Sequence, residues 1–295
     1  MRLTLLLLAW LTLPLSACAQ TTPAARGDGP ALWRIADADS EIWLFGTVHI
    51  LPPDLQWRTQ RINDAFASAD TLVLETDTSG ANAERLRALF LERGMDRSGE
   101  TLSSRLSAAE NARLERVARE LGLNVAAMQP MRPWFAAMQL SLLFVQAQGQ
   151  EPEAGVEAVL GREGARRNMR HVYFETPEEQ IGFLADLPPE IELAFLTSTL
   201  RQIEEEDANI EEMDEAWVNG DTERLSSLLN DAVDEAGPEV RAALLTDRNA
   251  RWVREIRAML AGRGRIFIAV GAAHLVGEDS VVDLLREQGV TVEGP

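Results

Sequence analysis

The sequence of 295 residues contains no lysine, so all 28 of its basic residues are arginine. Without lysine, Schiff-base catalysis and a P-loop nucleotide site are excluded. The arginines are outnumbered by 47 acidic residues, which gives a formal net charge of −19. We therefore expect no nucleic acid partner, because phosphate binding needs a basic surface. The same charge opposes attachment to anionic lipid, so a membrane anchor must have another source.

Cysteine is almost as scarce, since Cys18 is the only one in the chain. A single cysteine excludes an internal disulfide, a cysteine-rich zinc site and a C-x-x-C redox pair. The G-x-S-x-G, H-E-x-x-H and G-x-G-x-x-G motifs are also missing, which removes three common enzyme classes. With 46% hydrophobic residues, the chain can nevertheless bury a sizeable core.

The N-terminus has the pattern of a secretory signal. Arg2 precedes an apolar stretch over residues 3–13, which is too short to span a bilayer as a mature helix. Leu15-Ser16-Ala17-Cys18 resembles the bacterial lipobox. This implies cleavage of residues 1–17 and attachment of acyl chains, palmitate among them, to Cys18. The alternative is an ordinary signal peptide with a cysteine there by chance.

The residues after Cys18 predict the location of the protein. Ala19 stands where an aspartate would retain a lipoprotein at the inner membrane, so we expect an exported protein on the outer membrane, facing the periplasm. Residues 18–30 are rich in Thr, Ala, Gly and Pro and predict a flexible tether. The chain ends at Pro295 without an apolar segment, so we expect the lipid on Cys18 to be the sole anchor.

Residues 31–295 predict one α/β (α+β) domain whose central sheet is built from both ends of the chain. Short β-branched and aromatic runs predict strands over residues 32–35, 41–45, 71–75, 170–175, 265–270 and 290–292. Apolar spacing predicts helices over residues 61–69, 82–93, 107–121, 133–147, 178–186, 189–218, 221–234, 246–261 and 280–288. Residues 82–260 thus form a large helical insertion, the natural candidate for a lid.

Polar side chains follow predicted strands at three places. A strand leads into Gly-x-x-His twice, ending at His49 and at His274, and a third strand ends in Glu75. Because sites in parallel sheets form beyond the carboxyl ends of the strands, these side chains are expected to converge. Two imidazoles and a carboxylate make an ordinary shell for a divalent metal. Taken singly, each histidine has a structural alternative, and His171 is interpreted as surface or structural.

A series of motifs in order then resembles a known family. The motifs are Gly46-Thr47-Val48-His49 with Pro52, Leu74-Glu75, Arg132-Pro133-Trp134, Gly155-Val156-Glu157, Glu175-Thr176-Pro177-Glu178-Glu179-Gln180, Asp247-Arg248-Asn249 with Trp252, and Val270-Gly271-Ala272-Ala273-His274-Leu275. Together they resemble the TraB/PrgY/GumN family, whose superfamily includes the Tiki metalloproteases, over roughly residues 31–293.

The resemblance implies a metal-dependent hydrolase that uses divalent manganese or cobalt and acts on a peptide or protein substrate. Carried over by position, His49 and His274 are the implied metal ligands. Of Glu75 and Glu157, one is implied as a ligand and the other as general base for the attacking water, and the sequence does not divide these roles.

Two arginines match basic positions of the family, Arg132 and Arg248. The implied role of each guanidinium is to hold a carboxylate or a developing oxyanion.

Each of these residues also has a plainer interpretation. The two glutamates could cap helices or pair with arginine, and Arg132 could pack its stem against Trp134. Asp247-Arg248-Asn249 could belong to a helix start, because Thr246 and Asp247 are good N-cap types. For the whole protein, the alternative to a hydrolase is a non-catalytic lipoprotein that binds a peptide or another ligand in the same crevice.

Overall fold

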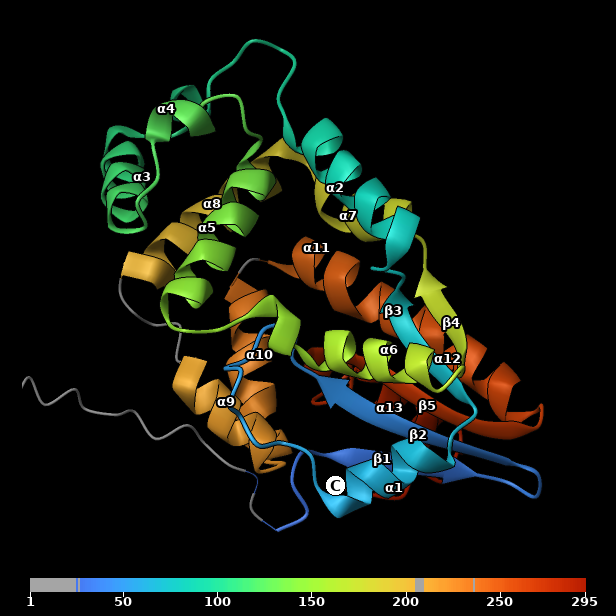
Figure 1. Cartoon of the computed structure of the whole chain (residues 1–295). Coiled ribbons are helices and arrows are strands. Elements are labelled where there is room, and N and C mark those ends of the chain that lie inside the picture. The colour runs from blue at the N-terminus through green and yellow to red at the C-terminus, as the bar shows by residue number, and fades with distance from the viewer. Residues whose placement is uncertain (1–24, 26, 205–209, 236) are drawn as a thin grey trace, which may run out of the picture.

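The computed structural model describes residue 25 and residues 27–204, 210–235 and 237–295 (Figure 1). The predicted signal peptide over residues 1–17, the lipidation site Cys18 and most of the tether lie outside the described residues. In these described ranges, no helix is both long enough and apolar enough to cross a membrane.

The centre of the fold is a five-stranded sheet with the order β1-β2-β5-β3-β4. Its strands are β1 (Leu32–Ala36), β2 (Ser40–Thr47), β3 (Thr71–Thr76), β4 (Arg170–Glu175) and β5 (Gly264–Gly271). Strand β1 is antiparallel to β2, and the other neighbours are parallel. Strand β5, from the C-terminal part of the chain, lies between β2 and β3. The predicted α/β fold with a split sheet is therefore confirmed.

The apolar composition of β5 suits its central position in the sheet. Its residues Phe267, Ile268, Ala269 and Val270 are at most 1% exposed, as expected for a parallel strand covered on both faces. The register pairs Thr47 with Gly271 and Leu74 with Ala269. The carboxyl ends of β2, β5 and β3 therefore lie side by side at one edge of the sheet.

Helices make up most of the rest of the chain. The α-helices are α1 (Gln60–Ser68), α2 (Gly80–Gly94), α3 (Ala108–Glu120), α4 (Val125–Met128), α5 (Pro133–Ala147), α6 (Val156–Arg166), α7 (Pro177–Ala185), α8 (Pro189–Glu204), α9 (Ile210–Val218), α10 (Thr222–Glu235), α11 (Pro238–Arg241), α12 (Asp247–Leu260) and α13 (Val281–Glu287). Short turns of other helix types are η1 (Leu102–Arg105), η2 (Pro152–Ala154), the π-helical η3 (Ala242–Thr246) and η4 (Ala272–His274).

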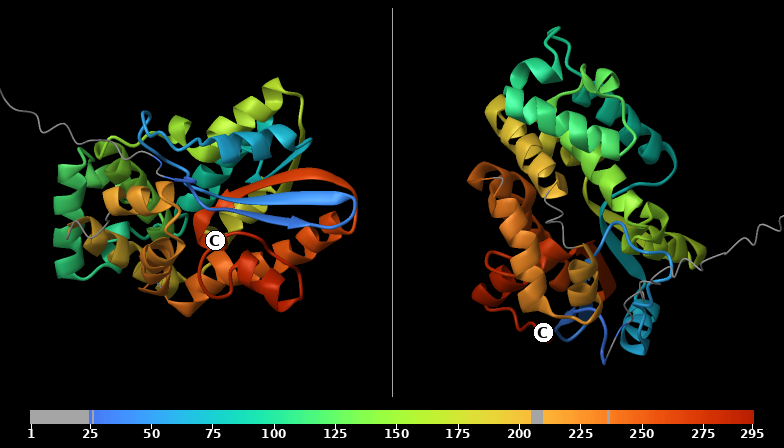
Figure 2. Two further views of the ribbon diagram at one scale, coloured as in Figure 1. Left: turned by 90° about the horizontal axis from the view of Figure 1, so that it is seen from below. Right: turned by 90° about the vertical axis from the view of Figure 1, so that its left-hand side faces the viewer.

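The helices divide into those that cover the sheet and those that pack with one another. Helices α1 and α6 lie on one face of the sheet, and α12 and α13 lie on the other (Figure 2). A second hydrophobic core joins α3, α5 and α8, and a third joins α2, α5 and α7. Figure 1 shows the second group standing away from the sheet. Helices α2, α3, α5, α7 and α8 thus form a separate helical layer, whereas β4, α6 and α12, which also fall within residues 82–260, belong to the sheet and to the helices that cover it.

Most predicted elements match within two residues, but some predictions were wrong. Residues 290–292 form no strand; instead Arg34 and Glu293 make a single antiparallel bridge, with backbone hydrogen bonds of 2.9 Å in both directions. The segment is too short and too polar beyond Val292 to extend the ladder along β1. No helix was predicted from the sequence over the residues of α6. The helix predicted over 189–218 is seen as α8 and α9, with residues 205–209 outside the described part.

Candidate functional site

The site lies where β2, β5 and β3 end. Gly271, the last residue of β5, is surrounded closely by the predicted side chains. A Cβ atom placed on Gly271 would lie 3.1 Å from Glu75 Oε1, 3.6 Å from His274 Cδ2 and 3.7 Å from His49 Nε2. The parallel register therefore brings all three predicted strand-end residues together, and glycine leaves their meeting point open, since a Cβ there would press on Glu75.

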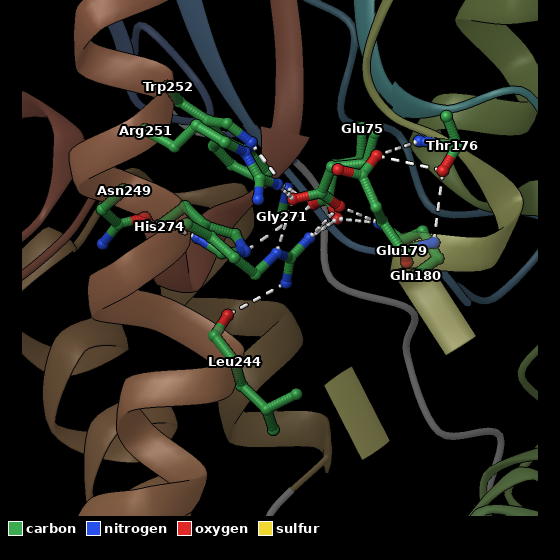
Figure 3. Close-up of polar contacts among 12 residues, drawn as sticks. Glu75, Thr176, Glu179, Gln180, Leu244, Asn249, Arg251, Trp252, Gly271 and His274 are labelled. Atoms are coloured by element: carbon green, nitrogen blue, oxygen red, sulfur yellow. Dashed lines mark hydrogen bonds and ion pairs between the residues drawn. The ribbon is translucent and has the colours of Figure 1, made fainter. Parts of the chain in front are cut away.

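Glu75 is held firmly from two sides. Its Oε1 accepts a 2.7 Å hydrogen bond from the Gly271 amide (Figure 3), and its Oε2 accepts a 2.6 Å bond from Arg248 Nη2. Burial works to raise the pKa of this carboxyl, but Arg248, His49 and the Gly271 amide outweigh it and lower the pKa below its usual range. Glu75 is therefore a fixed carboxylate at neutral pH.

His274 is buried, with 4% of its surface exposed. Its Nδ1 lies 2.6 Å from Asn249 Oδ1, while the amide nitrogen of Asn249 donates to Asp279 O at 2.9 Å. Nδ1 must then carry the proton, because the amide oxygen can only accept. Burial lowers the pKa of His274 to about 3, so the ring is neutral and Nε2 keeps a lone pair. That atom lies 3.9 Å from Glu75 Oε1.

His49 lies at the open side of the site. Its side chain is 65% exposed, and its Nδ1 lies 2.7 Å from Glu157 Oε1. The charge of Glu157 raises the pKa of His49 above its usual range. Glu157 also accepts a hydrogen bond from the Thr47 hydroxyl.

The start of α6 places Glu157 beside His49. The Val156 amide donates to Val48 O at 3.0 Å, so the helix begins against the loop after β2. A Cβ on Gly155, the N-cap of α6, would lie only 1.9 Å from His49 O. Only glycine fits at this approach, which is the physical reason for the Gly-x-Glu pattern.

These side chains suit a metal. His49, Glu75 and Glu157 each offer one ligand atom, and these atoms all lie within 4.8 Å of one another. Imidazole nitrogen and carboxylate oxygen are donors that divalent transition metals accept. The residues present therefore fit the metal that the sequence motifs imply, with His274 Nε2, 3.9 Å from Glu75 Oε1, as a further donor.

Behind Glu75 lies a buried charge network that the sequence analysis missed. The Glu175 side chain is fully buried and accepts from Arg248 Nε at 2.8 Å, from Arg251 at 2.6 Å and from Trp252 Nε1 at 3.1 Å. Arg248 thus bridges Glu75 and Glu175. Glu175 is the last residue of β4, and Glu75 is the last but one of β3, so a carboxylate near a strand end was the signal that could have found it.

Two local features of the chain, at the start of α7 and around Arg248, support this network. Thr176 and Glu179 form a capping box at the start of α7, which turns Gln180 back to donate to Glu175 (Figure 3). Arg248 lies in a helix that runs on unbroken from η3, and its Nη1 donates to Leu244 O at 2.9 Å. The N-cap interpretation of Thr246 is therefore wrong, because Thr246 has helical dihedrals and makes no side-chain cap.

Arg132 does not join this cluster. It is the N-cap residue of α5 and donates to Ala185 O at 2.8 Å and Arg93 O at 3.1 Å, while its guanidinium pairs with Glu192. Glu192 is only 2% exposed, and a buried carboxylate needs a cation beside it. The structure places Arg132 within the helical layer, where its observed contacts are structural. It is not brought together with His49, Glu75 or His274.

The cluster opens into a cavity of about 400 Å³. One wall consists of the strand-end residues, and aliphatic side chains from α5, α9, α10 and η3 form the rest. The site therefore has a polar end at the sheet and an apolar end under the helices.

Comparison with known proteins supports the family resemblance that the motifs indicated. The family model described as the TraB/PrgY/gumN family matches residues 31–294. The uncharacterized protein YbaP of Escherichia coli (strain K12) is 25% identical over 257 residues, which cover 87% of this chain and 92% of that protein. An uncharacterized protein of Treponema pallidum (strain Nichols) is 22% identical over 303 residues, or 94% of this chain and 88% of the relative. No solved structure matches.

Proposed function

Because the chain belongs to the TraB/PrgY/gumN family and gathers histidine and glutamate donors at one sheet edge, we propose that it is a lipid-anchored, metal-dependent hydrolase of peptide bonds. The observation that carries this proposal is the common meeting point of His49, Glu75 and His274 around Gly271. Paired histidines and a fixed carboxylate are the donor set of many metal-dependent hydrolases.

In this proposal, His49, Glu75 and His274 hold the divalent ion, manganese or cobalt. When bound, such an ion polarises the carbonyl under attack and lowers the pKa of water. Glu75 suits a ligand role because its oxygens are oriented by Gly271 and Arg248. Arg248 holds this carboxylate and Glu175, so we assign it a positioning role.

We assign the general base to Glu157. Its carboxylate contacts Thr47 and the exposed ring of His49, on the side where substrate and water enter. A carboxylate in that place can take a proton from water and pass it to a leaving amine. This assignment divides the roles that the sequence analysis left open.

Metal analysis tests the proposal directly. The purified chain, incubated with manganese or cobalt and then washed, is expected to keep about one ion per molecule, held by three protein donors with a position left for water. A variant with both His49→Ala and His274→Ala is expected to keep none. His171→Ala is the matched control, because the chain has three histidines and His171 lies on β4, bonded to Met169 O.

Cleavage of a peptide library, followed by mass spectrometry, separates enzyme from binder. The proposal predicts products from the loaded chain and none from Glu157→Gln. Metal retention with no product from any peptide would overturn hydrolysis and leave the alternative, a ligand-binding lipoprotein.

The lipid anchor has its own test. Cells fed labelled palmitate are expected to label the wild-type chain and not Cys18→Ser, and the labelled protein should fractionate with outer membranes. A wild-type chain that is cleaved, unlabelled and free in the periplasm would show an ordinary signal peptide instead.

A further inference from the structure

We propose that the cavity beside the cluster binds a large aliphatic side chain of the substrate peptide, next to the bond that is cleaved, and rejects charged side chains there. This inference rests on the proposed function, because it names the substrate class of the same site.

The walls of the cavity are aliphatic and come from separate helices. They include Val145 of α5, Met213 of α9, Leu229 and Val233 of α10, and Leu244 of η3. These side chains are half-buried, so apolar surface that the protein core leaves uncovered is gathered in one concave place. Such a pocket, with a few convergent polar groups at one end, is the usual form of a ligand site.

Charge is confined to the sheet end of the cavity. Among the described residues that line it, the charged side chains other than histidine are Glu75 and Arg248, which pair with each other at 2.6 Å. The polar lining residue Gln150 is 4% exposed, and its amide nitrogen is already bonded to Asp214 at 2.7 Å. A charged substrate side chain under the helices would lose its hydration and gain no partner.

The position of the polar end favours a peptide as the molecule that fills the cavity. The 65% exposed side chain of His49 marks the side open to solvent, so a polypeptide can pass over the cluster while one side chain points inward. A volume of about 400 Å³ accommodates a leucine or a larger apolar side chain. A long acyl chain, in contrast, is usually enclosed along its whole length.

Binding of small metal-chelating probes tests the inference without an activity assay. The metal-loaded full chain is titrated calorimetrically with the hydroxamates of N-acetylglycine, N-acetylleucine and N-acetyllysine. The leucine probe is expected to bind at least tenfold more tightly than the glycine probe, because it buries about four more apolar carbons. The lysine probe is expected to bind no better than the glycine probe.

Two matched leucine substitutions locate the effect. Leu229→Asp is expected to abolish the preference for the leucine probe and leave the glycine probe unchanged. Leu91→Asp is the control, because Leu91 is 59% exposed on α2 and outside the cavity lining; it should retain the full preference. If Leu229→Asp does not fold, Leu229→Ala is expected to reduce the preference several-fold.

The remaining outcomes distinguish failure of the aliphatic pocket from failure of the proposed function. Equal affinity for all three probes, with metal retained, would overturn the aliphatic pocket and leave the proposed function standing. Loss of both metal and probe binding in the wild type would overturn the proposed function and the inference with it. Tighter binding of decanohydroxamate than of the leucine probe would show an acyl-chain site and overturn the peptide assignment.

Discussion

Glu175 is the residue on which the geometry of the cluster depends most. It receives hydrogen bonds from Arg248, Arg251, Trp252 and Gln180, and Arg248 in turn orients Glu75. A carboxylate without solvent contact is costly unless its partners stay in place. The two carboxylates therefore have different roles. Glu75 faces the cavity, and Glu175 holds Arg248, which lies between them.

Glu175→Gln is expected to lower the free energy of unfolding by about 3 kcal/mol, because it removes one of the two carboxylates that pair with the buried Arg248. It should also weaken metal retention, since Arg248 is then free to turn from Glu75. Denaturant titration and metal analysis measure the two effects. Glu178→Gln is the control: Glu178 forms an exposed pair with Arg85, so its denaturation midpoint should stay at that of the wild type. Unchanged stability in Glu175→Gln would contradict the network.

Gly271→Ala is expected to abolish metal binding while the chain stays folded. The new Cβ would lie 3.1 Å from Glu75 Oε1 and push that carboxylate from its place. Gly161→Ala is the control, because its Cβ would meet Leu74 at an ordinary 3.8 Å and alanine favours a helix. Metal content and circular dichroism of the two variants check this, and full metal content in Gly271→Ala would refute the packing argument.

Among the helices, α9 both lines the cavity and connects the helical layer to the sheet. It contributes Met213 to the cavity, and it ties the helical layer to the sheet through Trp217, whose Nε1 donates to Gly46 O at 2.8 Å. It also carries Asp214, which is 2% exposed and has Oδ1 without a hydrogen-bond partner. Burial raises the pKa of Asp214 to about 6, so at neutral pH the helix contains an ionised group that costs stability.

The pH dependence of α9 follows from that shift. A carboxyl whose pKa is raised on folding stabilises the folded state below its unfolded pKa of 3.8, and this contribution is lost as the pH rises through about 6. Asp214→Asn is therefore expected to be more stable than the wild type at pH 7 by up to about 3 kcal/mol, with the difference vanishing near pH 4. Thermal unfolding across this range measures it. A constant difference at all pH values would show that Asp214 is not buried in ionised form.

At the scale of the whole molecule, the site exists only when both ends of the folded domain are in place. Strand β5 inserts between β2 and β3, and Glu75, His49 and His274 then meet. Long-range assembly of this kind makes metal binding and folding coupled events. The metal should therefore stabilise the entire domain and not just one loop.

Manganese at about 100 times its dissociation constant is expected to stabilise the chain by about 2.7 kcal/mol. The midpoint of thermal unfolding should then rise, and a chelator should reverse the rise. The His49→Ala, His274→Ala double variant should show neither effect, and His171→Ala should show both. An equal rise in the double variant would place the ion elsewhere on this strongly acidic surface.

Local patterns in the sequence predict most of the strands and helices and the residue types at the site. The strands that precede Gly46 and Gly271, the strand that ends at Glu75 and most helix bounds depend on short-range patterns of apolar residues and turns. The grouping of His49, Glu75 and His274 was also predictable, because the strands of a parallel sheet end at the same edge.

The partners that complete the site from distant parts of the chain could be identified from the folded structure alone. Glu157 reaches His49 through the close approach at Gly155, and Glu175 meets Arg248 across 73 residues of chain. Arg132, which the motifs placed in the catalytic group, instead neutralises Glu192 in the helical layer. The physical reason is that buried charges and apolar walls are satisfied by neighbours in space, and local sequence spacing carries no information about which helix will supply them.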